Sequence, residues 1–100
     1  MQAAKERGLD MQALARELNI NYRTFRNVFR QYTGVSPGRY LLDLRLAHAR
    51  NLLKETPQTA TEIARQVGFR DENHFFHYFK KRVGMTPSEW RFHSLQKLNT

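Results

Sequence analysis

The chain has 100 residues, with 17 lysines and arginines against 9 acidic residues, a net charge of +8 and no cysteine. These numbers exclude a disulfide scaffold and a cysteine-ligated zinc site, and a hydrophobic fraction of 40% is too high for a disordered basic tail. No apolar run approaches the roughly 20 residues of a membrane-spanning helix. The charge predicts a polyanionic partner, with nucleic acid ahead of an acidic membrane surface.

Apolar residues recur at helical spacing and no strand-like alternation occurs, so the predicted fold is all-α with about seven helices. A short first segment ends near Gly8. The later helices are predicted over residues 11–18, 22–32, 37–54, 60–67, 71–83 and 87–92.

In the first half of the chain, turn and capping residues mark the predicted boundaries. Asp10 is an expected N-cap, and Asn19 tolerates the left-handed backbone that a tight turn requires. Gly34 ends the second of these helices, and Ser36-Pro37 supplies a cap followed by proline at the first helical position.

In the second half, Thr59–Glu62 and Thr86–Glu89 have the form of a capping box, in which a threonine and a glutamate three residues later satisfy the first amides of a helix. Gly68 is placed to turn the chain, and Gly84 is placed to stop the helix before it.

An internal repeat organises the chain. Leu14-Ala15-Arg16 matches Ile63-Ala64-Arg65 49 residues later, and Phe25, Phe29, Gly34 and Pro37 match Phe75, Phe79, Gly84 and Pro87 50 residues later. Each copy is a short helix, a tight turn and a longer helix, which is the pattern of a helix-turn-helix. We predict two such subdomains, built like homeodomain units, over 1–35 and 57–100, joined by a linker helix within 36–56.

The longer helix of the first copy has two contrasting faces. The stripe predicted to be core contains Tyr22, Phe25, Val28, Phe29 and Tyr32. The opposite face carries Arg23, Arg26, Asn27 and Arg30 and no acidic residue, whereas an ordinary solvated face mixes charges. Arginine can bind guanine, and asparagine can bind adenine, through paired hydrogen bonds in the major groove. We therefore expect the first three to read bases and Arg30 to contact phosphate.

The longer helix of the second copy has a more varied outer face. Its predicted core stripe is Phe75, Tyr78, Phe79 and Val83. The base-reading candidates are Glu72, Asn73, His74 and His77, and the phosphate candidates are Lys80 and Lys81. Phe76 either packs on a thymine methyl group or extends the core. No third ligand lies near the two histidines, so we expect them to face the groove and to bind no metal.

The middle helix has a wide apolar arc that includes Leu42, Leu46, Ala49 and Leu53, which predicts burial by both neighbours. Its ~18 residues span about 27 Å, against about 34 Å between successive major-groove openings on one side of DNA. A spacer of this length could set the two recognition helices in adjacent grooves. Tyr40 and Trp90 occupy matching positions of the repeat and are expected core anchors.

The stretches 59–69, 75–81 and 84–91 resemble the signature of AraC/XylS-type transcription regulators, and 45–53 resembles the middle helix of that family. The resemblance extends from about Asp10 to Arg91. It implies a seven-helix fold that binds promoter DNA in the cytoplasm of a bacterium, usually activating transcription through contact with RNA polymerase. It implies base contacts from the same outer faces of the two longer helices. His77 stands where the family often has arginine, and Phe76 stands where a small residue is common.

Many members of that family carry a separate sensor and dimerisation domain, which nothing in these residues resembles. The chain is expected to be the DNA-binding part of a longer regulator or a small stand-alone member. We expect double-stranded DNA as its partner, and no cofactor or membrane contact.

Three other classes fit the sequence less well. A protein that coats nucleic acid without reading it needs lysines and arginines but not Asn27, Glu72 or Asn73 at base-reading positions. An RNA-binding protein would need an aromatic platform beyond Phe76. The serine, histidine and aspartate residues lie on caps and recognition faces and form no catalytic constellation, so no enzyme is expected.

Overall fold

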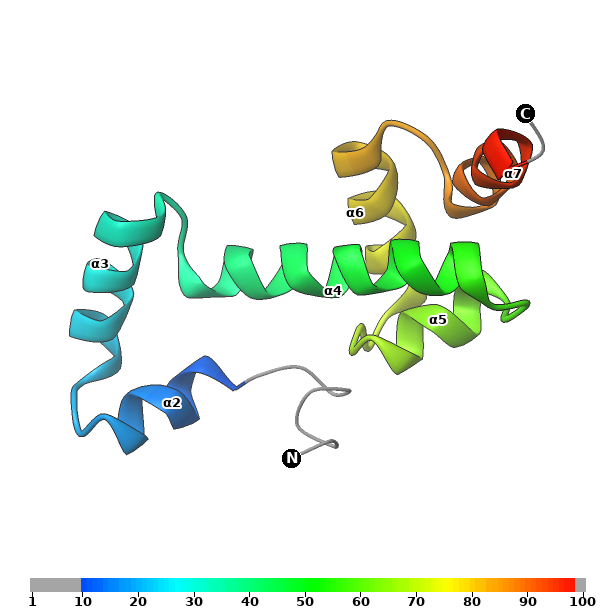
Figure 1. The fold of residues 1–100 in the computed structure, drawn as a ribbon. Helices are drawn as coiled ribbons and strands as arrows, with labels where there is room; N and C mark the ends of the chain where they lie inside the picture. The colour runs from blue at the N-terminus through cyan, green and yellow to red at the C-terminus, as the bar shows by residue number, and fades with distance from the viewer. Residues whose placement is uncertain (1–9, 99–100) are drawn as a thin grey trace. The chain divides into compact units, whose positions relative to one another are not determined.

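The structure, a computed structural model, describes residues 10–98 (Figure 1). This part of the chain contains six helices, α2 to α7, and no strand. It divides into two compact units, and the boundary along the chain lies between Leu44 and Arg45, within helix α4 (Pro37–Glu55). The predicted all-α class is therefore confirmed, while the predicted short first segment lies outside the described residues.

Unit 1 contains a helix-turn-helix made of α2 (Met11–Glu17) and α3 (Tyr22–Thr33), followed by the first part of α4. Asp10 caps α2 by accepting hydrogen bonds from the backbone amides of Gln12 and Ala13. The buried residues of this unit's core cluster are Met11, Ala15 and Phe25, with Tyr22, Phe29 and Leu41 packed against them.

Unit 2 repeats this arrangement with the rest of α4, α5 (Ala60–Gln66), α6 (Glu72–Val83) and α7 (Pro87–Leu98). Its buried apolar residues come from α4, α5, α6 and the turn between the last two: Leu46, Ala49, Leu53, Ile63, Ala64, Val67, Phe69, Phe75 and Phe79. The predicted capping box at Thr59 and Glu62 is present, with both reciprocal hydrogen bonds.

The turn inside each helix-turn-helix has the same hydrogen bonds in both units. The amide of Asn19 donates to the carbonyl of Arg16 at 3.0 Å, and the matching amide of Gly68 donates to Arg65 at 3.1 Å. The next amide in each copy bonds the carbonyl of the small helix residue, Ala15 or Ala64. This pairing is a Schellman motif, which needs a left-handed residue. Asn19 and Gly68 supply it with φ of 61° and 105°.

The apolar stripe predicted for α3 is only partly buried. Phe25 is 7% exposed, but Val28 is 44% exposed and Tyr32 is 86% exposed, so predicting these two as core was wrong. Helix α2 has seven residues against twelve in α3, so the stripe continues past the part that α2 can cover. Tyr40 is also half-exposed, although its ring packs edge-on against Phe29 with 5.3 Å between centroids.

Helix α7 is longer than the sequence predicted. It runs to Leu98 instead of ending near Phe92. Residues 93–98 contain no glycine or proline and include leucine, glutamine and lysine, which favour helix, so nothing local ends it. Within residues 10–98, no helix is both long and apolar enough to cross a membrane.

Arg91 ties α7 to the end of α4 within unit 2. Its Nε donates to the carbonyl of Leu53 at 2.8 Å, and its Nη2 donates to the carbonyls of Thr56 and Gln58. Lysine keeps the charge but lacks the planar fork that reaches several carbonyls, so Arg91→Lys should lower the free energy of unfolding by about 1–2 kcal/mol. Urea denaturation measures this loss. Arg70→Lys, on an exposed side chain, is the control, and an equal loss in both variants would contradict the proposed tie.

The capping box at the start of α7 predicts a dependence of stability on pH. The backbone amide of Thr86 donates to Glu89 Oε1 at 2.8 Å, while the Thr86 hydroxyl oxygen accepts from the Glu89 amide. These hydrogen bonds, with Lys80 and His93 nearby, lower the pKa of Glu89 below its usual 4.5. A carboxylate with a lowered pKa stabilises the fold above its unfolded pKa, and this contribution is lost as pH falls through the lowered value.

Glu89→Gln should therefore be less stable than the parent chain at pH 7, and the gap should narrow near pH 3, because the contribution of the carboxylate is lost as pH falls through the lowered pKa of Glu89. Chemical denaturation at the two pH values measures the gap. Glu55→Gln removes the same charge from the last residue of α4 and should show no such pattern. A gap for Glu89→Gln that persists unchanged near pH 3 would rule out a role for the carboxylate charge.

Candidate nucleic-acid interface

The outer face of α3 is basic and open to solvent. Arg23, Arg26, Asn27 and Arg30 are all exposed, and the twelve residues of α3 include no acidic side chain. Phe25, on the opposite side, is buried in the core of unit 1. The N-cap Asn21 accepts from the amide of Thr24 at 3.2 Å, which fixes where the helix begins. The four predicted residues of α3 therefore share one accessible face on a helix anchored by its other side.

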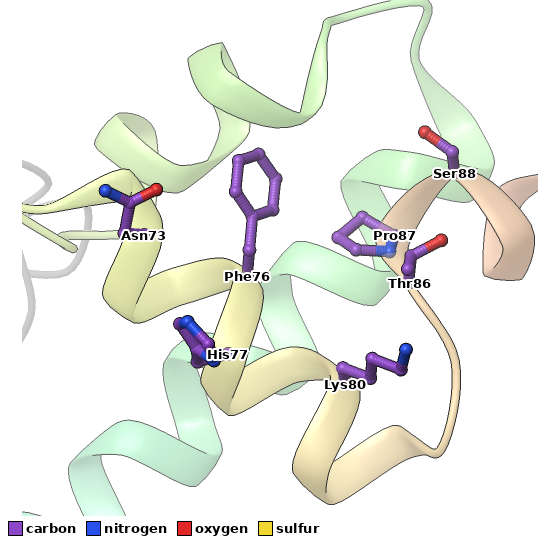
Figure 2. A pocket seen from close by; sticks show the side chains of 7 residues that line it. All are labelled: Asn73, Phe76, His77, Lys80, Thr86, Pro87 and Ser88. Atoms are coloured by element: carbon purple, nitrogen blue, oxygen red, sulfur yellow. The ribbon is translucent and has the colours of Figure 1, made fainter.

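The outer face of α6 holds the remaining sequence-predicted residues. Phe75 and Phe79 are fully buried on the inner side, and Asp71 caps the helix by accepting from the amide of Asn73 at 2.9 Å. The predicted residues on the outer side are all exposed: Glu72, Asn73, His74, His77, Lys80 and Lys81. Figure 2 shows that Asn73, His77 and Lys80 follow one another along the helix. Their spacing of three to four residues places them on a single stripe.

His74 is placed differently from the other candidates. Its ring lies edge-on to Phe69, with 5.3 Å between ring centroids, and 6.2 Å from the ring of Tyr78. These contacts hold the imidazole on the flank of α6, away from the stripe of Asn73 and His77. The sequence grouped His74 with the other base-reading candidates and could not reveal its aromatic neighbours.

Two hollows flank the exposed stripe of α6. One, of about 320 Å³, is lined by Asn73, Phe76, His77, Lys80, Thr86, Pro87 and Ser88 (Figure 2). The other, of about 400 Å³, lies at the start of the helix and is lined by Arg65, Arg70, Asp71, Glu72 and Asn73.

The second hollow contains two arginines that the sequence prediction missed. Arg65 and Arg70 are exposed beside the N-terminus of α6, where their charges suit a backbone phosphate next to the helix. The internal repeat matches Arg65 with Arg16, but no pattern in the sequence places Arg65 or Arg70 beside the start of α6. Within the described residues, no group of three or more histidine, aspartate or glutamate side chains could hold a metal ion.

Comparison with known proteins agrees with this geometry. The family model described as a helix-turn-helix domain matches residues 14–92. A transcriptional regulator with an AraC-type DNA-binding domain from Chromobacterium violaceum has a similar structure, with a TM-score of 0.84 and 32% identity, covering 96% of this chain and 86% of that one. The chain belongs to the AraC-type helix-turn-helix family.

Other AraC-type relatives include a transcriptional activator and a domain solved with DNA. The activator RhaR of Salmonella schwarzengrund is 38% identical over 91 residues, which are 91% of this chain and 32% of that protein. The DNA-binding domain of AdpA, a global transcriptional factor solved in complex with a target DNA, has a TM-score of 0.85 and 26% identity, covering 95% of this chain and 86% of that one.

This chain spans about a third of the length of the curated relatives it matches. Membership in the AraC-type family makes this chain a sequence-specific DNA-binding domain of a kind found in transcription regulators. This assignment accounts for the net charge of +8 and for the two exposed polar faces of α3 and α6.

Proposed function

We propose that the chain binds a two-part site in double-stranded promoter DNA, with α3 and α6 entering successive major grooves. The observation that carries this proposal is the repeated unit, in which a buried aromatic side and an exposed polar side occur on both helices. A protein that only coats DNA would need one basic surface. It would not need two recognition helices with different chemistry. We assign 1–35 and 57–100 to the two subdomains and 36–56 to the linker.

The two helices are proposed to read different bases. On α3, Arg23 and Arg26 suit guanine and Asn27 suits adenine. On α6, Glu72 suits the amino group of cytosine and Asn73 suits adenine, with His77 beside them and His74 at the edge of the face. Arg30, Lys80 and Lys81 are proposed to contact phosphates, which position a protein on the duplex without reading sequence.

The proposed role in the cell is activation of transcription in the bacterial cytoplasm, through contact with RNA polymerase. The RhaR relatives, which are named transcriptional activators, support this role. A sensor or dimerisation domain elsewhere in a longer regulator stays a prediction. Transcription in vitro from a template carrying the selected site beside a promoter tests activation. Transcript yield should rise when the chain is added, and an unchanged or reduced yield would contradict activation.

Binding-site selection from a random duplex pool tests the DNA-reading proposal. The selected site should contain two short blocks about 10 base pairs apart, one for each unit. The enriched duplex is then titrated against a scrambled duplex at two salt concentrations. The preference for the selected site should persist at both, because base contacts do not depend on counterion release as phosphate contacts do.

Other outcomes of the selection would change the proposal in defined ways. A single enriched block would mean that one unit reads bases and the other only anchors the chain. No enriched block, together with a steep salt dependence, would favour the coating protein and overturn the proposed function.

A further inference from the structure

One aromatic ring lies within the polar stripe of α6. Phe76 is only half-buried, although the neighbouring Phe75 and Phe79 are fully buried. Its ring contacts Phe75 with 5.6 Å between centroids. Phe76 follows Asn73 by three residues, so one turn of helix carries both an amide and an exposed part of an aromatic ring. Packing in the core therefore covers only part of the Phe76 ring, and the rest is open to solvent.

The open side of Phe76 faces the hollow of about 320 Å³ between α6 and the start of α7. Figure 2 shows the ring projecting from α6, with Asn73 on one side and Pro87 on the other. Phe76 and Pro87 supply the apolar wall, while polar and charged side chains supply the remainder of the lining. The hollow thus offers an apolar surface at the edge of a face built to meet base edges.

The major groove presents one apolar group to such a surface, which is the methyl group on C5 of thymine. We propose that Phe76 is a specificity-determining residue that packs against the C5 methyl group of a pyrimidine. In unmodified DNA this pyrimidine is thymine, and it lies beside the base read by Asn73 or His77. This inference rests on the proposed function, because it requires α6 to lie in a major groove.

The proposal predicts that removing one methyl group from the DNA weakens binding. Deoxyuridine pairs like thymidine but lacks the methyl group, so each thymine of the selected site is replaced by uracil in turn. At one position the dissociation constant should rise about fourfold, which corresponds to about 0.8 kcal/mol for one buried methyl-sized group. Fluorescence anisotropy at a fixed salt concentration measures each constant.

Variants of Phe76 then test whether this side chain makes the contact. With Phe76→Ser, replacing the sensitive thymine by uracil should no longer weaken binding, so the two changes are not additive. Phe76→Leu keeps an apolar side chain and should keep most of the sensitivity. Phe92→Ser removes an aromatic ring that is 58% exposed on α7 and should leave the uracil effect unchanged. Circular dichroism of each variant checks its fold. If Phe76→Ser fails to fold, Phe76→Ala, which also removes the ring, takes its place in this comparison and should likewise lose the uracil effect.

A further pair of duplexes separates the effect of the methyl group from the effect of the rest of the base. Replacing the sensitive thymine–adenine pair by cytosine–guanine, with and without a methyl group on C5 of the cytosine, compares two DNAs that differ by that group alone. The methylated duplex should bind about fourfold more tightly.

The possible results distinguish a failure of this inference from a failure of the proposed function. If a site is selected but contains no thymine whose methyl group matters, or if the uracil effect persists in Phe76→Ser, the inference is wrong and the proposed function stands. In that case Phe76 only completes the core. If no site is selected at all, the proposed function fails and this inference fails with it.

Discussion

Replacing Phe75 with alanine should lower the free energy of unfolding of unit 2 by about 3–5 kcal/mol, the usual cost of removing a large aromatic side chain from a core. Phe75 is fully buried and contacts Phe69 and Phe79, with 5.2 and 5.7 Å between ring centroids. A domain of this size has a total stability of only about 5–15 kcal/mol, so this variant should lose a large share of it.

The single tryptophan, Trp90, lies in unit 2, so its fluorescence during urea denaturation reports on that unit. The matched control is Phe92→Ala, in the same unit, because Phe92 is 58% exposed and an exposed substitution changes stability by about 0.5 kcal/mol at most. If the two variants unfold at similar urea concentrations, Phe75 does not organise the core of unit 2.

The parts of the fold that the sequence predicted well depend on local chemistry. Asn19 was expected in a left-handed turn and has φ of 61°, and Gly34 ends α3 with φ of 85°. The capping boxes at Thr59–Glu62 and Thr86–Glu89 form as predicted. Each of these features is decided within four or five residues, so a single sequence contains the necessary information.

The features that the sequence did not predict depend on which elements lie beside each other. The spacing of Val28 and Tyr32 placed both on the apolar stripe, but spacing does not say how far a neighbouring helix extends over it. Arg91 bonds carbonyls 33 to 38 residues earlier in the chain, and no local pattern indicates such a partner.

The candidate site also has some features that the sequence predicted and others that depend on neighbouring segments. Periodicity was enough to place Arg26 and Asn27 on one face of α3 and Asn73 and His77 on one face of α6, since a helix with one buried side has a defined outer side. The aromatic neighbours of His74 and the hollow beside Phe76 arise from contacts with other segments, so only the structure reveals them.

Arg26→Ala should weaken binding to the selected site by about 1–3 kcal/mol, or about 5- to 150-fold, and should relax the base preference at one position. The physical reason is that the guanidinium can donate two hydrogen bonds to the O6 and N7 atoms of guanine, whereas alanine leaves both acceptors without a protein partner. Arg26 is exposed at the centre of the α3 face, and the buried Phe25 beside it anchors the helix. Titration of the parent chain and the variant against all four bases at each position of the first block measures both effects.

Arg30→Ala is the matched control, because it removes the same charge from the same face one turn further along α3. A phosphate contact contributes equally to every sequence, so this variant should bind the selected and the scrambled duplex more weakly by the same factor. The slope of log affinity against log salt concentration should fall by about the amount that one phosphate contact contributes. The two variants should therefore differ in their preference for the selected duplex over the scrambled duplex, and not only in how much affinity each loses. If Arg26→Ala also weakens both duplexes equally, Arg26 binds phosphate, and the base reading of unit 1 depends on Arg23 and Asn27.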